Sequence, residues 1–292
     1  PPVVEKFRAY LRLDTSNPPG NEIRGALFLK ELLGREGVEA ELFEPEPGRA
    51  SLYARLRGTG KEPGLLLHHH IDVVPAPAAG WERPPFAAEL VRGNVLVGRG
   101  TMDTKGLGIA QLEAFLALKR SRARLRRDVV LLATADEETG GQGGSRYLDE
   151  IGLLGRDGFA MLTPEPTGGV VWNANRGAIT LRITVKGKPA HVGLQHQGIN
   201  AFELMLEVAR AFQELKSEVE ARTTGWRIVP EEAAHSILML GGRVEGGTNF
   251  NVVPGTCSFT VERRFNPEED LAAERTRLFA VLGRLRKRGI DM

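Results

Sequence analysis

Residues 65–75 read LLLHHHIDVVP, an apolar run that ends in three histidines and is followed, two positions later, by an aspartate. The run has the length and composition of a buried strand. Side chains alternate along a strand, so His68, His70 and Asp72 would face one side. Ligands of an open α/β sheet bind at the carboxyl ends of its strands. The stretch therefore predicts that His70 is a functional group at a strand end and that Asp72 accepts its second N–H.

The sequence around this stretch alternates between helical and strand patterns. We expect helices near residues 22–35 and 105–119, and strands near 38–43, 51–56, 65–70, 128–135 and 158–162. The run VVLLATA at 129–135 is apolar on both sides, as in a strand whose two faces are covered by helices. The first part of the chain is therefore predicted to be an α/β domain.

After residue 168 the pattern becomes that of a second domain. Apolar and polar residues alternate in AITLRITV at 178–185, which is typical of a strand with one exposed face. A helix is expected near 201–215, strands near 236–244 and 256–264, and a last helix near 268–287. The order β-α-β-β-α predicts a small α+β domain. We place the two domains at 1–172 and 173–292.

The composition is that of an ordinary globular protein, with 26% charged and 41% hydrophobic residues and a formal net charge of +2. So small a charge gives no support to a nucleic-acid partner. The basic run KRSRARLRR at 119–127 is interpreted as a solvated helix end, because it holds no aromatic residue that could stack on bases. The sequence has no apolar run of membrane-spanning length, and no membrane partner is expected. Cys257 is the only cysteine, which favours a reducing, cytoplasmic location.

Carboxylates follow three more of the expected strand ends. Asp103 lies in the glycine-rich loop GRGTMDTKG, just before a helix. The stretch TADEETGGQGG places Asp136, Glu137 and Glu138 directly after an apolar strand. Adjacent carboxylates repel one another unless a cation or a proton offsets their charge. Glu165 lies between two prolines in LTPEPTGG, where a solvated turn explains that residue equally well by itself.

One histidine and several carboxylates at successive strand ends are the nitrogen and oxygen ligands that Zn²⁺ accepts. A metal site explains all four strand ends together. A phosphate-binding loop does not, because GGQGGS lacks the required lysine and the G-x-G-x-x-G spacing. A serine hydrolase is also disfavoured, because the sequence contains no G-x-S-x-G nucleophile elbow.

The motifs of the chain, taken in order, resemble those of one enzyme family. They are SNPPGNE (16–22), HIDVVP (70–75), GRGTMDTKG (98–106), DEETGG (136–141), EPT (165–167), GKPAHVG (187–193), GIN (198–200), NVVP (251–254) and ERRFNP (262–267). They resemble the dizinc aminoacylase and carboxypeptidase family, of the acetylornithine deacetylase, succinyl-diaminopimelate desuccinylase and glutamate carboxypeptidase type. The resemblance runs nearly end to end. It implies a zinc-exopeptidase-like catalytic domain, with a mixed and mostly parallel sheet, and an α+β lid that forms a dimer.

The resemblance also implies which residues hold metal. His70 and Glu165 would bind one zinc ion, and Glu138 would bind a second. Asp103 would bridge the two ions, for which Co²⁺ or Mn²⁺ could substitute. The resemblance further implies a cis peptide bond between Asp103 and Thr104.

Catalytic roles follow from the same resemblance. Asp72 would orient His70, while His68 and His69 would pack around the site. Glu137 would be the general base that takes a proton from the attacking water and delivers it to the leaving nitrogen. These roles define a hydrolase that depends on its metal ions for activity.

Three residues of the lid resemble substrate-contacting residues. His191 would reach the oxyanion of the tetrahedral intermediate, often from the other copy in a dimer. Asn251 and Arg264 would bind the substrate carboxylate, a task suited to the planar donors of arginine. Without the resemblance, His191 would be interpreted as a turn residue and Arg264 as a surface strand residue.

The expected function is therefore hydrolysis of the amide bond of an N-acyl amino acid, or of a small peptide with a free carboxylate. A dipeptidase or aminopeptidase of the same fold is the nearest alternative, and a catalytically silent dimerising or binding protein is another. In the family, a segment after the lid supplies a last histidine to the zinc that Glu138 binds, and these 292 residues hold no counterpart. We therefore expect a truncated chain that binds the metal of His70 and Glu165 better than the metal of Glu138 and shows little or no hydrolysis.

Overall fold

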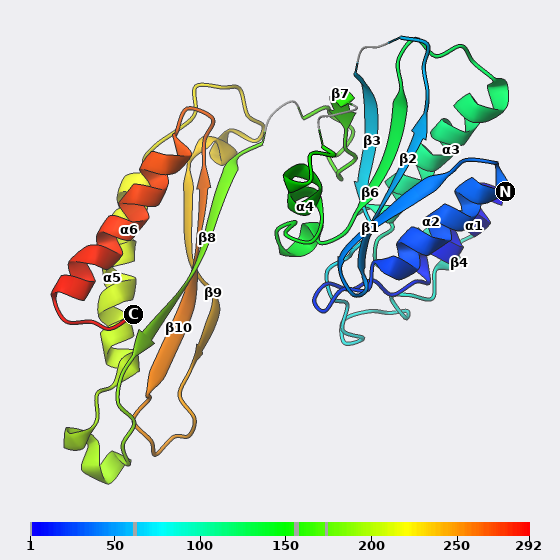
Figure 1. Ribbon diagram of the computed structural model, residues 1–292. Coiled ribbons are helices and arrows are strands. Elements are labelled where there is room, and N and C mark those ends of the chain that lie inside the picture. Colours follow the sequence, from blue (N-terminus) through cyan, green and yellow to red (C-terminus); the bar gives the residue numbers. More distant parts are fainter. Residues whose placement is uncertain (1, 61–62, 155–157, 173–174) are drawn as a thin grey trace. The chain divides into compact units, whose positions relative to one another are not determined.

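The computed structural model describes residues 2–60, 63–154, 158–172 and 175–292, which form two compact units, Pro1–Val170 and Val171–Met292 (Figure 1). The expected boundary between residues 172 and 173 touches residues 173–174, which lie outside the described residues. The contacts divide the chain two residues earlier. None of the helices in the described ranges is long and apolar enough to cross a membrane.

A five-stranded sheet forms the centre of the first unit. Its helices are α1 (Pro2–Leu11), α2 (Ile23–Arg35), α3 (Lys105–Ser121) and α4 (Ser145–Glu150), and its strands are β1 (Ala40–Glu46), β2 (Arg49–Leu56), β3 (Gly64–His70), β6 (Val129–Thr134) and β7 (Gly158–Leu162), with a separate hairpin of β4 (Glu89–Val91) and β5 (Val95–Val97). The strand order is β1-β2-β6-β3-β7. β2 is antiparallel to both neighbours, whereas β3 is parallel to β6 and β7, so four strands point one way. The predicted α/β class with a mixed, mostly parallel sheet is confirmed.

Helices cover both faces of this sheet. Leu131 and Ala133 of β6 belong to a core that includes residues of α1, α2 and α3. Val130 and Leu132 point the other way and pack with Leu148 of α4. Because β3, β6 and β7 are parallel, their carboxyl ends meet at one edge of the sheet, which is where ligands collect in such folds.

Several elements of the first unit differ from the predicted ones. α1 and α4 were not expected, since a helix of 10 or 6 residues shows little periodicity. The strand predicted at 38–43 instead runs from Ala40 to Glu46 and so passes through Pro45. The strand is at the edge of the sheet, where a missing N–H is tolerated, and its register shifts between Phe43 and Glu46.

The second unit is a three-stranded antiparallel sheet covered by helices. It contains β8 (Gly177–Lys186), η2 (Val192–Gln197), α5 (Ala201–Glu220), η3 (Glu231–Ala234), β9 (Ile237–Gly246), β10 (Thr256–Phe265) and α6 (Leu271–Lys287), where η marks a 3₁₀ helix, and the strand order is β8-β10-β9. Phe212 of α5 packs edge-on against Phe259 of β10, with ring centroids 6.4 Å apart. α6 begins three residues later than predicted because Asp270 caps it, accepting a hydrogen bond from Ala273 N–H.

Gly108 sets how closely α3 approaches β3. A Cβ atom at Gly108 would lie 2.4 Å from Cδ2 of His69, a side chain that is fully buried. We expect Gly108→Ala to lower the free energy of unfolding by ~1–3 kcal/mol, because the ring has no space to move into. The control is Gly34→Ala in α2, where the new Cβ would meet no atom within 4 Å. That variant should gain up to ~1 kcal/mol from helix propensity, and equal effects in urea denaturation would contradict the account.

Candidate metal centre

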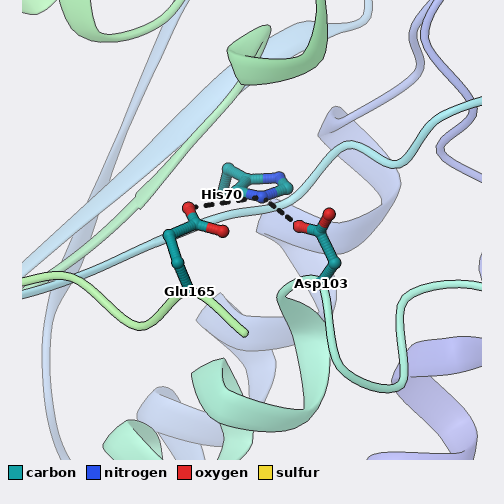
Figure 2. A group of neighbouring side chains, drawn as sticks. All are labelled: His70, Asp103 and Glu165. Atoms are coloured by element: carbon teal, nitrogen blue, oxygen red, sulfur yellow. Dashed lines mark hydrogen bonds and ion pairs between the residues drawn. The ribbon is translucent and has the colours of Figure 1, made fainter. Parts of the chain in front are cut away.

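Three segments that are distant in sequence bring His70, Asp103 and Glu165 together (Figure 2). His70 ends β3, Asp103 precedes α3 and Glu165 follows β7. Nε2 of His70 lies 2.8 Å from Oδ1 of Asp103 and 4.0 Å from Oε1 of Glu165. The ligand atoms of the three residues all lie within 4.8 Å of one another, as a shared metal ion requires.

Glu137 and Glu138 form a second group around the same histidine. They lie on the 3₁₀ helix η1 (Glu137–Thr139), which directly follows β6 and Asp136. Their carboxylate oxygens and a ring nitrogen of His70 also lie within 4.8 Å of one another. One oxygen of Glu138 accepts the backbone N–H of Val74 at 3.1 Å. Both glutamates therefore lie beside His70. The role of Asp103 as a bridge between two metal ions stays a prediction.

Asp72 supports His70 and the two glutamates at once. Nδ1 of His70 lies 2.9 Å from the backbone carbonyl of Asp72 and 3.5 Å from its carboxylate Oδ1. The carbonyl is therefore the nearer acceptor, which the alternation of side chains did not indicate. The Asp72 carboxylate accepts the backbone N–H groups of Glu137 at 3.1 Å and Glu138 at 3.0 Å. Nε2 of His70 is thus directed toward the carboxylates on its other side.

The other two histidines of the triplet pack around the site. The His69 ring meets Tyr10 edge-on and lies 3.4 Å from its hydroxyl group. The two ring nitrogens of His68 lie 2.9 Å and 3.0 Å from the hydroxyl groups of Thr163 and Thr134. Burial, together with nearby histidines, lowers the pKa of His68 to about 4 and that of His69 to about 3. Both rings are therefore neutral near pH 7.

The charge at this edge of the sheet is predominantly negative. Burial opposes a charge on His70, but contacts with Asp103 and Asp72 outweigh burial and raise its pKa to about 11. Burial and the nearby Asp103 raise the pKa of Glu138 to about 7, and burial also raises the pKa of Glu165. A cation would offset the repulsion among these carboxylates. A nitrogen ligand with several carboxylate oxygens therefore fits a divalent metal ion.

Hydrogen bonds of Thr104 and Lys105 hold the loop that carries Asp103. The peptide bond between Asp103 and Thr104 is cis, which confirms the prediction. Thr104 Oγ1 donates to the carbonyl oxygen of His70 at 3.1 Å. Lys105 is fully buried, and its Nζ donates to the carbonyl oxygen of Leu13 at 2.7 Å. Burial lowers the pKa of Lys105 to about 7. The sequence predicted the cis bond but no role for the side chains of Thr104 and Lys105.

The candidate substrate residues lie in the second unit. Exposed His191 pairs with Val252 through an isolated bridge, so Asn251 lies beside it. The side-chain oxygen of Asn251 is buried and has no hydrogen-bond partner within the ranges that the structure describes. Arg264 is on the far part of β10, where its Nε lies 2.6 Å from Oε1 of Glu262. The structure thus brings His191 and Asn251 together but not Arg264.

Three polar residues contact the aspartates next to Glu137 and Glu138, and the sequence predicted no role for them. Asn17, Glu22 and Arg49 lie within hydrogen-bond distance of Asp136 or of Asp72. Asn17 and Glu22 belong to the motif SNPPGNE, which was the one signal available for them. Arg49 belongs to no recognised motif.

Comparison with known proteins identifies the family. Residues 66–273, most of the chain, match the family described as "Peptidase family M20/M25/M40". The chain belongs to this family. It is 31% identical over 284 residues to a probable succinyl-diaminopimelate desuccinylase of Staphylococcus aureus (strain MSSA476), covering 91% of this chain and 68% of the relative. It is 30% identical over 279 residues to aminoacylase-1 of Mus musculus, covering 93% and 67%.

Solved structures of two peptidases share the fold. A metallo-carboxypeptidase of the M20 family, Sso-CP2 from Sulfolobus solfataricus, aligns with a TM-score of 0.71 at 18% identity, covering 97% of this chain and 75% of that one. The dipeptidase Dug1p from Saccharomyces cerevisiae aligns with a TM-score of 0.72 at 16% identity, covering 99% and 74%. The family match and the two sequence relatives show that this M20 chain is a metal-dependent hydrolase, as the resemblance of its motifs implied.

Proposed function

We propose that this M20 chain hydrolyses the amide bond of an N-acyl amino acid or small peptide that carries a free carboxylate. The observation that carries the proposal is the position of His70 Nε2, 2.8 Å from Asp103 and 4.0 Å from Glu165, with Glu137 in the adjoining group. The names of the two sequence relatives, a desuccinylase and an aminoacylase, support an N-acyl amino acid as substrate.

The proposed cofactor is a pair of zinc ions, for which Co²⁺ or Mn²⁺ can substitute. His70 and Glu165 would hold one ion and Glu138 the other, with Asp103 between them. Metal held there supplies Lewis acidity, which polarises an amide carbonyl and acidifies water. The four carboxylates grouped around His70 support this assignment.

Glu137 is the proposed general base. Its carboxylate belongs to the group around His70, and its backbone is fixed by Asp72. Partial burial, with the nearby Asp72 and Asp103, raises the pKa of Glu137 although the charge of His70 opposes the shift. Its carboxylate takes a proton from the attacking water, and the resulting carboxyl group gives that proton to the leaving nitrogen.

We assign the substrate carboxylate to Arg264 and Asn251, and the oxyanion to His191. Thr256, close to Asn251 in sequence, and Arg264 are eight positions apart on β10, which corresponds to about 26 Å at ~3.3 Å per residue. Residues at the two ends of β10 in one copy are therefore too far apart to contact the same small substrate. This separation supports a homodimer in which two copies contribute. A cytoplasmic location stays a prediction.

The experiment offers the zinc-loaded chain N-acetyl amino acids, N-succinyl amino acids and dipeptides, each beside its carboxyl-terminal amide. Product is accumulated over hours and measured by mass spectrometry. We expect N-acyl amino acids to be hydrolysed at least ~10-fold faster than their amides, because an arginine–carboxylate bond is worth ~1.5–3 kcal/mol. A chelator should abolish product formation. Equal rates for the acids and their amides, or product formation that survives removal of the metal, would contradict the proposal.

A further inference from the structure

The turn that carries Glu137 and Glu138 rests on buried polar groups that the roles above do not use. Asp136 directly precedes the turn, which is the 3₁₀ helix η1, and it is 5% exposed with a left-handed backbone of φ 64°. Its Oδ2 accepts the backbone N–H of Gly143 at 2.9 Å. Its Oδ1 accepts from Nη2 of Arg49 at 2.6 Å. The aspartate therefore ties the start of the turn both to the loop that follows it and to β2.

Arg49 is itself fixed by Glu22. Nε and Nη2 of Arg49 donate to the two carboxylate oxygens of Glu22, at 2.8 Å and 2.9 Å, in the paired geometry that suits arginine. Glu22 is fully buried, and its Oε1 also accepts the backbone N–H of Asp136 at 3.2 Å. The Glu22–Arg49 pair thus holds both the backbone and the side chain of Asp136.

Asn17 connects this aspartate to the support of His70. Its Nδ2 lies 3.0 Å from Oδ1 of Asp136 and 2.8 Å from Oδ2 of Asp72. Asp72 in turn contacts His70 and the backbone N–H groups of the Glu137–Glu138 turn. Asn17 is 2% exposed, so water does not compete strongly for these bonds. These contacts form one continuous chain of hydrogen bonds from Glu22 to His70.

We propose that Asp136 is a positioning residue, held in place by Arg49 and Asn17. It fixes the turn that carries Glu137 and Glu138 against Asp72. In this way it sets the distance of the two glutamates from His70. The inference rests on the proposed function, because it matters only if those side chains bind metal and move protons. Partners behind metal ligands are typically worth ~10–100-fold in metal affinity. A displacement of ~1 Å at a catalytic group can cost ~10²-fold in rate.

The same strand carries a matched control at its other end. Asp128 precedes β6, as Asp136 follows it, and is 8% exposed. One of its oxygens accepts from Nε of Arg55 at 2.7 Å, and the other accepts the backbone N–H of Gly58 at 2.6 Å. Both aspartates therefore pair with an arginine of β2 and with a glycine amide. They differ in that Asp136 alone adjoins the turn.

The test compares Asp136→Asn with Asp128→Asn in the full chain. Asparagine keeps the shape of the side chain and tolerates the left-handed backbone, but it removes the charge. Zinc affinity is measured by calorimetry on chelator-stripped protein, and hydrogen exchange of the turn is followed without metal. We expect Asp136→Asn to weaken zinc binding ~10–100-fold and to speed exchange at Glu137 and Glu138. Asp128→Asn should change zinc affinity less than ~2-fold and leave hydrogen exchange at the turn unchanged, because distant sites contribute independently.

Equal zinc affinities in the two variants, or unchanged exchange at the turn in Asp136→Asn, would overturn the proposal. If Asp136→Asn does not fold, exposed Thr139 carries the same test, since its hydroxyl donates to Asp136 and lies 2.9 Å from Asn17 Nδ2. Thr139→Val should weaken zinc binding, whereas Thr139→Ser, which keeps the hydroxyl group, should bind zinc as the unchanged chain does. Unchanged zinc affinity in Thr139→Val, or weakened affinity in Thr139→Ser, overturns the proposal. Glu165→Gln separates the two claims, because zinc affinity unchanged in that variant contradicts the proposed metal site itself.

Discussion

Glu137→Gln is expected to lower the rate of amide hydrolysis by ~10²–10⁴-fold while the zinc content of the chain stays unchanged, because general acid–base help is worth that much. Glutamine has the size of glutamate and leaves the backbone bond to Asp72 intact. It cannot accept a proton from water or return one to the leaving nitrogen. The loss should therefore appear in kcat rather than in metal binding.

Two measurements check this expectation together. Turnover of an N-acyl amino acid is followed by mass spectrometry, and bound zinc is measured by elemental analysis. Glu138→Gln is the matched control, because it changes the neighbouring glutamate in the same way and is expected to lose zinc. Near-normal turnover in Glu137→Gln would remove Glu137 from its role as the base.

Asp103→Ala is expected to release both metal ions, not one. Asp103 is the carboxylate nearest to His70 Nε2, at 2.8 Å, and its charge is the main one that raises the pKa of Glu138. A carboxylate between two cations offsets charge on each of them, so its loss weakens both sites. The decrease in zinc affinity should exceed the ~10–100-fold that is typical when a residue hydrogen-bonded to a metal ligand is removed.

The control for this prediction is Glu165→Gln, which removes a ligand expected to serve one ion only. Zinc titration of the two variants should give a partial loss for Glu165→Gln and a nearly complete loss for Asp103→Ala. Retention of two zinc ions per chain in Asp103→Ala, measured after dialysis, would contradict the bridging role.

Much of this site could be predicted because its residues follow strands with a clear pattern. The apolar run of β6 predicted a strand covered on both faces, and Val130 and Leu131 indeed point to two different cores. Because β3, β6 and β7 are parallel, residues after each strand lie at one edge. That geometry brings His70 and Glu165 together although they are far apart in sequence.

Other features could not be predicted because they depend on contacts between distant residues, which leave no periodic pattern in the sequence. Arg49 and Asp136 are 87 positions apart, and nothing in the short stretch around Arg49 indicates an ion pair. The nearer acceptor for His70 is the backbone of Asp72, which side-chain alternation does not describe. The separation of Arg264 from His191 follows from the length and direction of β10, which become evident only with the strand pairings.

The most direct test of the metal-dependent site is a zinc-edge anomalous difference map of crystals of the zinc-loaded chain. A zinc ion bound as proposed gives a peak at ~2.0–2.2 Å from Nε2 of His70 and from carboxylate oxygens of Asp103 and Glu165. A second peak is expected between Asp103 and Glu138. A fully loaded crystal with no anomalous peak at His70, or with zinc bound only elsewhere on the chain, would contradict the account.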